Sequence, residues 1–318
     1  MKRRSVVTNF ATASAVSLIA PILFVAASEK PHTDYTITSE SRLVVLDVSV
    51  NDSHAQSPAG LSKENFSISE NGRPQKISVF DNRDAPVSVG ILVDESSSMS
   101  PKRAHVIAAA QTFIEESNPH DEVFVLNFND RVVPGLPPGV LFSDDPSQLR
   151  AALHRGVAAG KTALNDAIVD GLRQLEHGRQ DKKTLVLISD GGDNASVHTR
   201  REMLDLVERS IATIYTIGLF DPDDEDRDPR LLERLARMSG GVVYLPKDIS
   251  DMVPVCRKIA KDIRSRYTLG YVPPVENGRT PVRHIQVRVS APGYTKLVAR
   301  TRGSYRYDPI PGTEGRPE

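Results

Sequence analysis

One stretch decides the fold: Val87-Ser88-Val89-Gly90-Ile91-Leu92-Val93, which runs directly into Asp94-Glu95-Ser96-Ser97-Ser98-Met99-Ser100. An almost uniformly apolar run that stops at acidic and hydroxyl groups indicates a buried strand ending in a polar loop. Continuous apolar strands are typical of parallel sheets that are covered on both faces. Ser100 followed by Pro101 suits the start of a helix, so the sequence predicts a strand, a loop and a helix in succession.

The same pattern of apolar strands and amphipathic helices continues to about Arg266. The expected strands are Val87–Val93, Glu122–Phe128, Thr184–Ile188, Ala212–Leu219 and Val242–Leu245. The expected helices are Lys102–Glu116, Pro146–Arg155, Ala163–Glu176, Arg200–Arg209, Pro229–Met238 and Ile249–Arg264. Alternation of this kind implies a mostly parallel sheet with helices on both faces. We therefore predict a doubly wound α/β domain over residues 86–266.

Short alternating β patterns flank this domain on both sides. They are Leu43–Val50, Phe66–Ser69 and Lys76–Phe80 before it, and Tyr267–Tyr271, His284–Ser290 and Tyr294–Arg302 after it, with turns at Asn71-Gly72 and Asn277-Gly278. Neither flank alone buries enough apolar surface for a core. We expect residues 35–85 and 267–307 to pair as one small β-sandwich-like module, into which the α/β domain is inserted. Residues 308–318, rich in Pro and Gly, are expected to be disordered.

The first 27 residues have the layout of an export signal. Lys2-Arg3-Arg4 precede an apolar run from Ala11 to Ala27, which ends in small residues suited to cleavage. The run is barely long enough to span a bilayer, so an uncleaved membrane anchor is the alternative. Cys256 is the only cysteine and excludes an intramolecular disulfide. We expect an exported protein, periplasmic or secreted, that contacts a membrane only if this segment is retained.

The overall charge gives no sign of nucleic-acid binding. Lys and Arg number 40 and Asp and Glu 41, which leaves a formal net charge of -1. A nucleic-acid-binding protein normally shows a basic excess. The stretch from Arg257 to Arg306 is locally basic, which a solvated face explains more simply.

Three polar clusters fall at the carboxyl ends of expected strands or in loops beside them, where open α/β sheets bind ligands. Asp94, Ser96 and Ser98 are two residues apart and can present their oxygens to one point. Thr162 lies at the start of an expected helix, and Asp190 ends the strand before Gly191. Two carboxylates and three hydroxyls suit Mg²⁺, Mn²⁺ or Ca²⁺ better than Zn²⁺. Such a set leaves a coordination position for an incoming carboxylate.

This set resembles the von Willebrand factor A family, whose metal-ion-dependent adhesion site consists of an Asp-x-Ser-x-Ser motif, a distant Thr and a distant Asp. The match falls on Asp94, Ser96, Ser98, Thr162 and Asp190, in the family's order. The resemblance covers Val87 to about Arg266, and the whole layout is similar to a group of bacterial exported proteins related to this domain. It implies that serines, and usually the threonine, bind a divalent cation directly, while the aspartates often act through water.

The resemblance also implies a function: an adhesion-type, protein-binding module of the cell envelope, whose protein partner supplies a Glu or Asp carboxylate to the metal. No enzymatic activity is expected. A phosphatase that forms an aspartyl-phosphate on Asp94 normally has a second acid two positions on, where this chain has Ser96.

Other interpretations remain open at this point. The three hydroxyl residues could merely cap helices, with Asp94 and Asp190 ending strands. A metal-dependent hydrolase would need a base, for which only Glu95 or Asp193 is available. A structural envelope module would need no metal. The acidic run Asp221–Asp228 lacks the features of a calcium loop and is interpreted as an exposed loop. Cys256 is interpreted as a packed side chain.

Overall fold

A computed structural model of the chain describes residues 43–54, 56–58, 60–220, 226–274 and 282–306. Four expectations lie outside these ranges in whole or in part: the export signal, the disordered tail, the acidic run from residue 221 and the turn at Asn277-Gly278. Among the helices that are described, none has the length and apolar character needed to cross a membrane.

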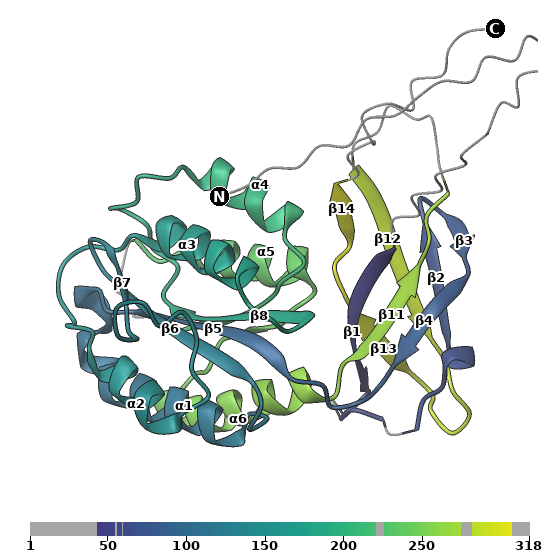
Figure 1. The fold of residues 1–318 in the computed structure, drawn as a ribbon, viewed down its shortest axis with the longest axis horizontal. Coiled ribbons are helices and arrows are strands. Elements are labelled where there is room, and N and C mark those ends of the chain that lie inside the picture. The colour runs from purple at the N-terminus through teal and green to yellow at the C-terminus, as the bar shows by residue number, and fades with distance from the viewer. Residues whose placement is uncertain (1–42, 55, 59, 221–225, 275–281, 307–318) are drawn as a thin grey trace, which may run out of the picture. The chain divides into compact units, whose positions relative to one another are not determined.

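A six-stranded sheet forms the centre of the α/β domain (Figure 1). Its order is β10-β9-β8-β5-β6-β7, and only β7 runs antiparallel to its neighbour. Every residue of β5, β6 and β9 is buried, as is typical of strands covered on both faces. The strands are β5 (Val87–Asp94), β6 (Glu122–Phe128), β7 (Val132–Pro134), β8 (Lys182–Ser189), β9 (Thr213–Gly218) and β10 (Val243–Tyr244).

Six helices cover the two faces of this sheet, with α1, α2 and α6 on one face and α3, α4 and α5 on the other (Figure 1). Helix α5 shows how the sequence sets their ends: Asp228 accepts a hydrogen bond from the Leu231 amide at its start, and Gly240 ends it in the left-handed region. The helices are α1 (Arg103–Glu116), α2 (Pro146–His154), α3 (Leu164–Glu176), α4 (Arg200–Arg209), α5 (Pro229–Ser239) and α6 (Met252–Arg264).

The predicted doubly wound α/β fold is confirmed, with two local corrections. Strand β7 was not expected, because three edge residues that include a proline give no recognisable strand pattern. Ser100 does not cap an α-helix. It lies inside a 3₁₀ helix, η2 (Ser97–Lys102), and α1 begins only at Arg103. A sequence pattern does not separate a first α-helical turn from a 3₁₀ turn.

Two four-stranded antiparallel sheets form the β-sandwich-like module, with orders β13-β1-β11-β4 and β14-β12-β2-β3. Each sheet combines strands from both flanks, and side chains from both sheets share one apolar cluster. The predicted module is therefore present, although the domain boundaries at 86 and 266 stay a prediction. The strands are β1 (Val44–Asp52), β2 (Phe66–Glu70), β3 (Arg73–Gln75), β4 (Ile77–Asp81), β11 (Tyr267–Tyr271), β12 (Val282–Val289), β13 (Leu297–Arg300) and β14 (Ser304–Arg306).

Candidate functional site

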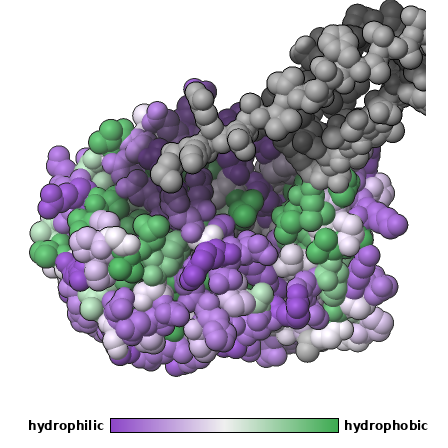
Figure 2. Space-filling model, viewed as in Figure 1, coloured by the Kyte–Doolittle hydropathy of each residue, from purple (hydrophilic) through white to green (hydrophobic). Residues whose placement is uncertain are grey.

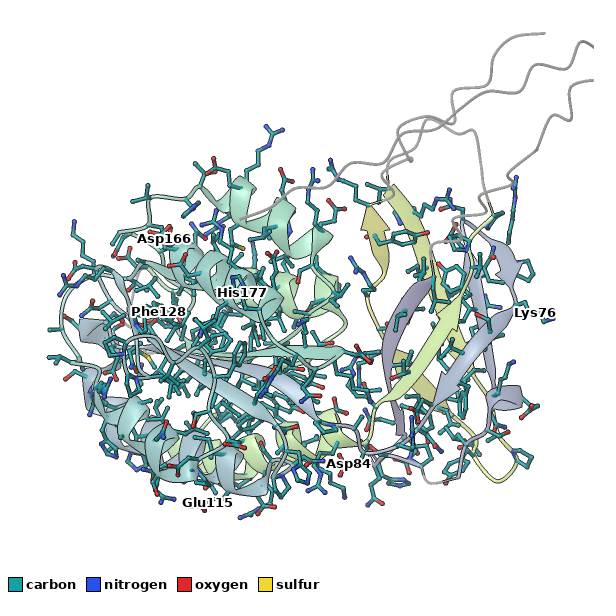
Figure 3. All side chains as sticks on the ribbon, in the orientation of Figure 1. Lys76, Asp84, Glu115, Phe128, Asp166 and His177 are labelled. Atoms are coloured by element: carbon teal, nitrogen blue, oxygen red, sulfur yellow. The ribbon has the colours of Figure 1, made fainter. Side chains whose placement is uncertain are left out.

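The polar loop after β5 begins at the edge of the sheet where the parallel strands end. Asp94 is the last residue of β5 and is only 2% exposed. Its Oδ1 accepts a hydrogen bond from the Ser96 amide at 2.9 Å, which turns the chain directly after the strand. The Glu95 amide donates to the Phe128 carbonyl at 2.7 Å, which ties the loop to the end of β6. Phe128 is labelled on this side of the domain in Figure 3.

The end of β8 completes a chain of hydrogen bonds with this loop. The Ser189 hydroxyl donates to Asp94 Oδ2 at 2.6 Å, and the Ser98 hydroxyl donates to Asp190 Oδ2 at 2.6 Å. The hydroxyls of Ser96 and Ser98 lie 3.0 Å apart. Strands β5 and β8 are adjacent and parallel, so their ends bring both aspartates to one place. Four of the five predicted site residues therefore lie in direct hydrogen-bonded contact.

The backbone of Thr162 is hydrogen-bonded to Asn194, which follows Asp190 in the chain. Its amide donates to Asn194 Oδ1 at 2.9 Å, and its carbonyl accepts from the Asn194 amide at 3.0 Å. Among the described residues no hydrogen bond joins the Thr162 hydroxyl to the other four side chains. The structure thus places Thr162 in a loop held against the residues that follow Asp190, and it is only 6% exposed.

Paired backbone contacts hold the Thr162 loop against the serine loop. The Ser97 amide donates to the Gly160 carbonyl at 3.1 Å, and the Gly160 amide donates to the Ser97 hydroxyl at 3.0 Å. Gly160 has a φ of 90°, and a Cβ there would lie 2.0 Å from an Asp130 carboxylate oxygen. A side chain at this position would displace the Asp130 carboxylate, and the left-handed φ itself favours glycine.

Two buried acids lie side by side in this site without a cation from the protein. Burial, together with the nearby charge of Asp190, raises the pKa of Asp94 to about 7. Among the described residues no Lys, Arg or His nitrogen lies within 4.0 Å of either carboxylate, and both residues are 2% exposed. Uncompensated acids of this kind are unfavourable unless a positive charge is added from outside.

The hydroxyl groups do not act as simple helix caps. Ser96 occupies the N-cap position of η2, yet its side chain makes no capping hydrogen bond. The N-cap residue of α3 is Ala163, so Thr162 lies one residue before the N-cap and not at it. The Ser98 hydroxyl is directed to Asp190. The capping interpretation therefore fails for all three residues.

An all-oxygen set of two carboxylates and three hydroxyls fits a hard divalent cation. Within the described ranges, no three or more His, Cys, Asp or Glu side chains cluster in a way that could hold a metal. The candidate site differs from such clusters because most of its oxygens come from Ser and Thr. A cation held mainly by neutral hydroxyls would keep much of its charge.

Glu95 and Asp193, the two possible bases, are both engaged in holding loops. Glu95 is 1% exposed, and its Oε2 lies 2.8 Å from Arg103 Nε. The Arg103 guanidinium also donates to the Gly156 carbonyl at 2.7 Å, which fixes the start of the Thr162 loop. Asp193 accepts hydrogen bonds from Asn165 and Ser196. Both carboxylates therefore make contacts that hold loops in place.

Sequence reasoning missed three residues that support the site: Ser189, Asn194 and Arg103. Ser189 precedes Asp190 at the end of a buried strand. Only this position in the sequence could have indicated that it belongs to the site. Asn194 lies in a loop without a distinctive sequence pattern, and its side chain accepts a hydrogen bond from the Thr162 amide. Arg103 gave no signal, because its pairing with Glu95 depends on the turn of η2.

Comparison with known proteins identifies the α/β domain. Residues 89–192, which contain all five site positions, match the family model described as the von Willebrand factor type A domain. No curated protein matches the chain. A solved structure described as von Willebrand factor type A from Catenulispora acidiphila is similar over 84% of this chain and 74% of its own, with 16% identity and a TM-score of 0.50.

Two further solved structures are similar over smaller parts of the chain. BatB, a conserved hypothetical protein from Bacteroides thetaiotaomicron, is 16% identical over 56% of this chain and 100% of its own, with a TM-score of 0.43. Proximal thread matrix protein 1 from the mussel byssus, with a zinc-occupied MIDAS motif, is 14% identical over 61% and 49%, with a TM-score of 0.48. The family match and the observed fold agree that this chain carries a domain of the von Willebrand factor type A family.

Proposed function

We propose that this chain is a protein-binding module of the cell envelope that depends on a divalent cation. The von Willebrand factor type A domain is a protein-interaction module. In our proposal Ser96, Ser98 and Thr162 hold the cation through their hydroxyls, while Asp94 and Asp190 orient water and hydroxyl groups around it. The bound cation, Mg²⁺ or Mn²⁺ or Ca²⁺, supplies positive charge and a coordination position to a Glu or Asp of the partner.

One observation carries this proposal: Asp94 and Asp190 are both buried, share a chain of hydrogen bonds with Ser96 and Ser98, and have no cationic side chain within 4.0 Å in the part of the chain that the structure describes. A purely structural site would have matched these charges with Lys or Arg. Because only two carboxylates are present, a bound divalent cation would keep attraction for a third carboxylate from a partner.

Catalysis is less well supported than binding. A hydrolase of this kind would need a base beside the metal, and Glu95 and Asp193 are both held in other contacts. The absence of enzymatic activity stays a prediction. The export of the protein is likewise proposed from its N-terminal sequence.

Calorimetry tests the metal proposal. Wild-type protein titrated with Mg²⁺ or Mn²⁺ should release or absorb heat at one site, and Asp94→Asn should bind about a hundredfold more weakly because it removes one of two site charges. Asp205→Asn, an exposed residue of α4, is the matched control and should bind as wild type does. Equal binding by all three proteins, or none by wild type, would remove the metal from the proposal.

A capture experiment tests the partner. The wild-type chain should retain a protein from envelope extract in Mg²⁺ and release it in EDTA, whereas Asp94→Asn should retain nothing above background. Release by EDTA connects the partner to the metal. A partner that is retained equally in EDTA would instead support a metal-independent structural module.

A further inference from the structure

A pocket of about 470 Å³ lies between α6 and residues from β1, β10 and β13, separate from the residues of the candidate metal site. Four cationic side chains line it: Arg257, Lys258 and Lys261 on α6, and Arg300 at the end of β13. Tyr244 of β10 forms part of its wall. The surface over α1 and α6 is largely hydrophilic in Figure 2. This volume is within the range of small-molecule sites in proteins.

Three of the four cations of this pocket, Lys258, Lys261 and Arg300, have no ion-pair partner among the described residues. A neighbouring pocket of about 420 Å³ shares Arg257 and Lys261 with it and shows the contrast. There Arg257 pairs with Glu116 at 3.0 Å, and Arg264 pairs with Asp84 at 2.7 Å. No carboxylate of the described chain lies within 4.0 Å of the Lys258, Lys261 or Arg300 nitrogens. The protein therefore neutralises Arg257 and Arg264 with its own carboxylates and leaves Lys258, Lys261 and Arg300 for a ligand.

Tyr244 lies near two of these cations, Lys258 and Arg300. The Lys258 ammonium lies over its ring, 5.7 Å from the centroid. Burial raises the pKa of the Tyr244 hydroxyl, the nearby charge of Asp262 raises it further, and the charge of Arg300 lowers it. Lys258 and Arg300 thus act on the same aromatic side chain from different elements. The tyrosine keeps its proton and can donate a hydrogen bond.

The one carboxylate in the pocket, Asp262, does not cancel these charges. It is 7% exposed and is held by the buried Arg266, whose guanidinium nitrogen lies 3.8 Å away, and by the Tyr215 hydroxyl. Arg266 also donates to the Asp47 carbonyl at 2.8 Å and to the Tyr215 hydroxyl at 2.9 Å. Asp262 therefore has its own counter-charge, and the excess in the pocket is positive.

We propose that this pocket binds a phosphate-bearing anion through Lys258, Lys261 and Arg300, with Tyr244 as an additional donor. Two lysines and an arginine present more donors than one carboxylate can accept, whereas a phosphate offers several oxygens and up to two charges. The phosphate could belong to a soluble polyphosphorylated compound or to a lipid headgroup, and the chemistry of recognition is the same. The binding does not use the metal site.

The test compares two doubly substituted full-length chains with wild type. Lys258→Gln/Lys261→Gln removes two exposed cations of the pocket, and Lys63→Gln/Lys76→Gln removes two exposed cations of the β-sandwich-like module. Lys76 is labelled in Figure 3. Both variants change the net charge equally, and neither removes a buried side chain, so both should fold. Circular dichroism checks this.

Binding is measured with inorganic tripolyphosphate by calorimetry, and with vesicles of phosphatidylcholine, with or without phosphatidylglycerol, by co-sedimentation. The pocket variant should bind one of these phosphate probes at least about tenfold more weakly, and the control variant should bind as wild type does. Tripolyphosphate binding alone indicates a soluble ligand, and preference for phosphatidylglycerol indicates a headgroup. EDTA and Asp94→Asn should change neither result. No binding of either probe by wild type, or equal weakening by both variants, would overturn the proposal.

Discussion

The β-sandwich-like module and the α/β domain differ in whether a buried carboxylate has a cationic partner among the described residues. In the β-sandwich-like module, Glu70 is 3% exposed and fully matched: Arg283 lies 2.6 Å from its Oε1, and the hydroxyls of Tyr271 and Tyr305 donate to its Oε2 at 2.6 and 2.8 Å. In the α/β domain, Asp94 and Asp190 are linked through Ser96 and Ser98, and no cationic side chain of the described residues lies within 4.0 Å of either. A satisfied network fixes one structure, whereas an unsatisfied pair leaves a position for a ligand.

Breaking the satisfied network should have the largest effect. Glu70→Ala leaves the buried Arg283 without its carboxylate, and the free energy of unfolding should fall by about 3–5 kcal/mol. Urea denaturation followed by circular dichroism measures this. The matched control is Glu115→Ala, an exposed residue of α1 labelled in Figure 3, which should change stability by less than about 0.5 kcal/mol. Similar losses in both variants would show that the Glu70 network is not special.

Removing one charge from the pair Asp94 and Asp190 should raise the free energy of unfolding when no metal is present. In EDTA, Asp94→Asn relieves the burial of two like charges and should raise the free energy of unfolding by on the order of 2 kcal/mol. In excess Mg²⁺ the order should reverse, because wild type binds the cation about a hundredfold more tightly and gains more stability from it. Denaturation of both proteins in the two buffers tests this. A variant less stable than wild type in EDTA would contradict the comparison.

Asp121 is a buried acid that accepts hydrogen bonds but has no cationic partner among the described residues. Its substitution should change the free energy of unfolding the least of the three. Asp121 accepts hydrogen bonds from the amides of Val87 and Asn118, but it has no cationic partner within 4.0 Å among the described residues. Burial raises the pKa of Asp121 to about 6. A raised pKa in the folded state contributes stability that is present below about pH 4 and is lost as the pH rises through about 6.

Asp121→Asn removes this titration. The stability of the variant relative to wild type should therefore increase by about 1 kcal/mol between pH 4 and pH 7.5. Asp181→Asn, an exposed residue before β8, should show no such trend. Thermal unfolding over this pH range is the measurement, and parallel curves for all three proteins would contradict the expected role of Asp121.

The sequence by itself determined the order of strands and helices in the α/β domain. Buried parallel strands are apolar along their whole length, so β5 and β6 were predicted to within a residue. It also predicted that Asp94 and Asp190 lie at the same edge of the sheet, because parallel strands end at one edge, whereas the pairing of β5 with β8 was seen only in the structure. Short elements escaped prediction: β3, β7 and β14 have three residues each, too few to show a period.

Only the tertiary structure decided which polar side chains are matched and which are left unmatched. Ser189 and Asn194 resemble ordinary strand-end and turn residues until their hydrogen bonds to Asp94 and Thr162 are seen. The pairing of Glu70 with Arg283 joins residues that are 213 positions apart in the sequence. Local patterns record burial and periodicity, whereas charge balance depends on contacts between distant segments, which no local pattern contains.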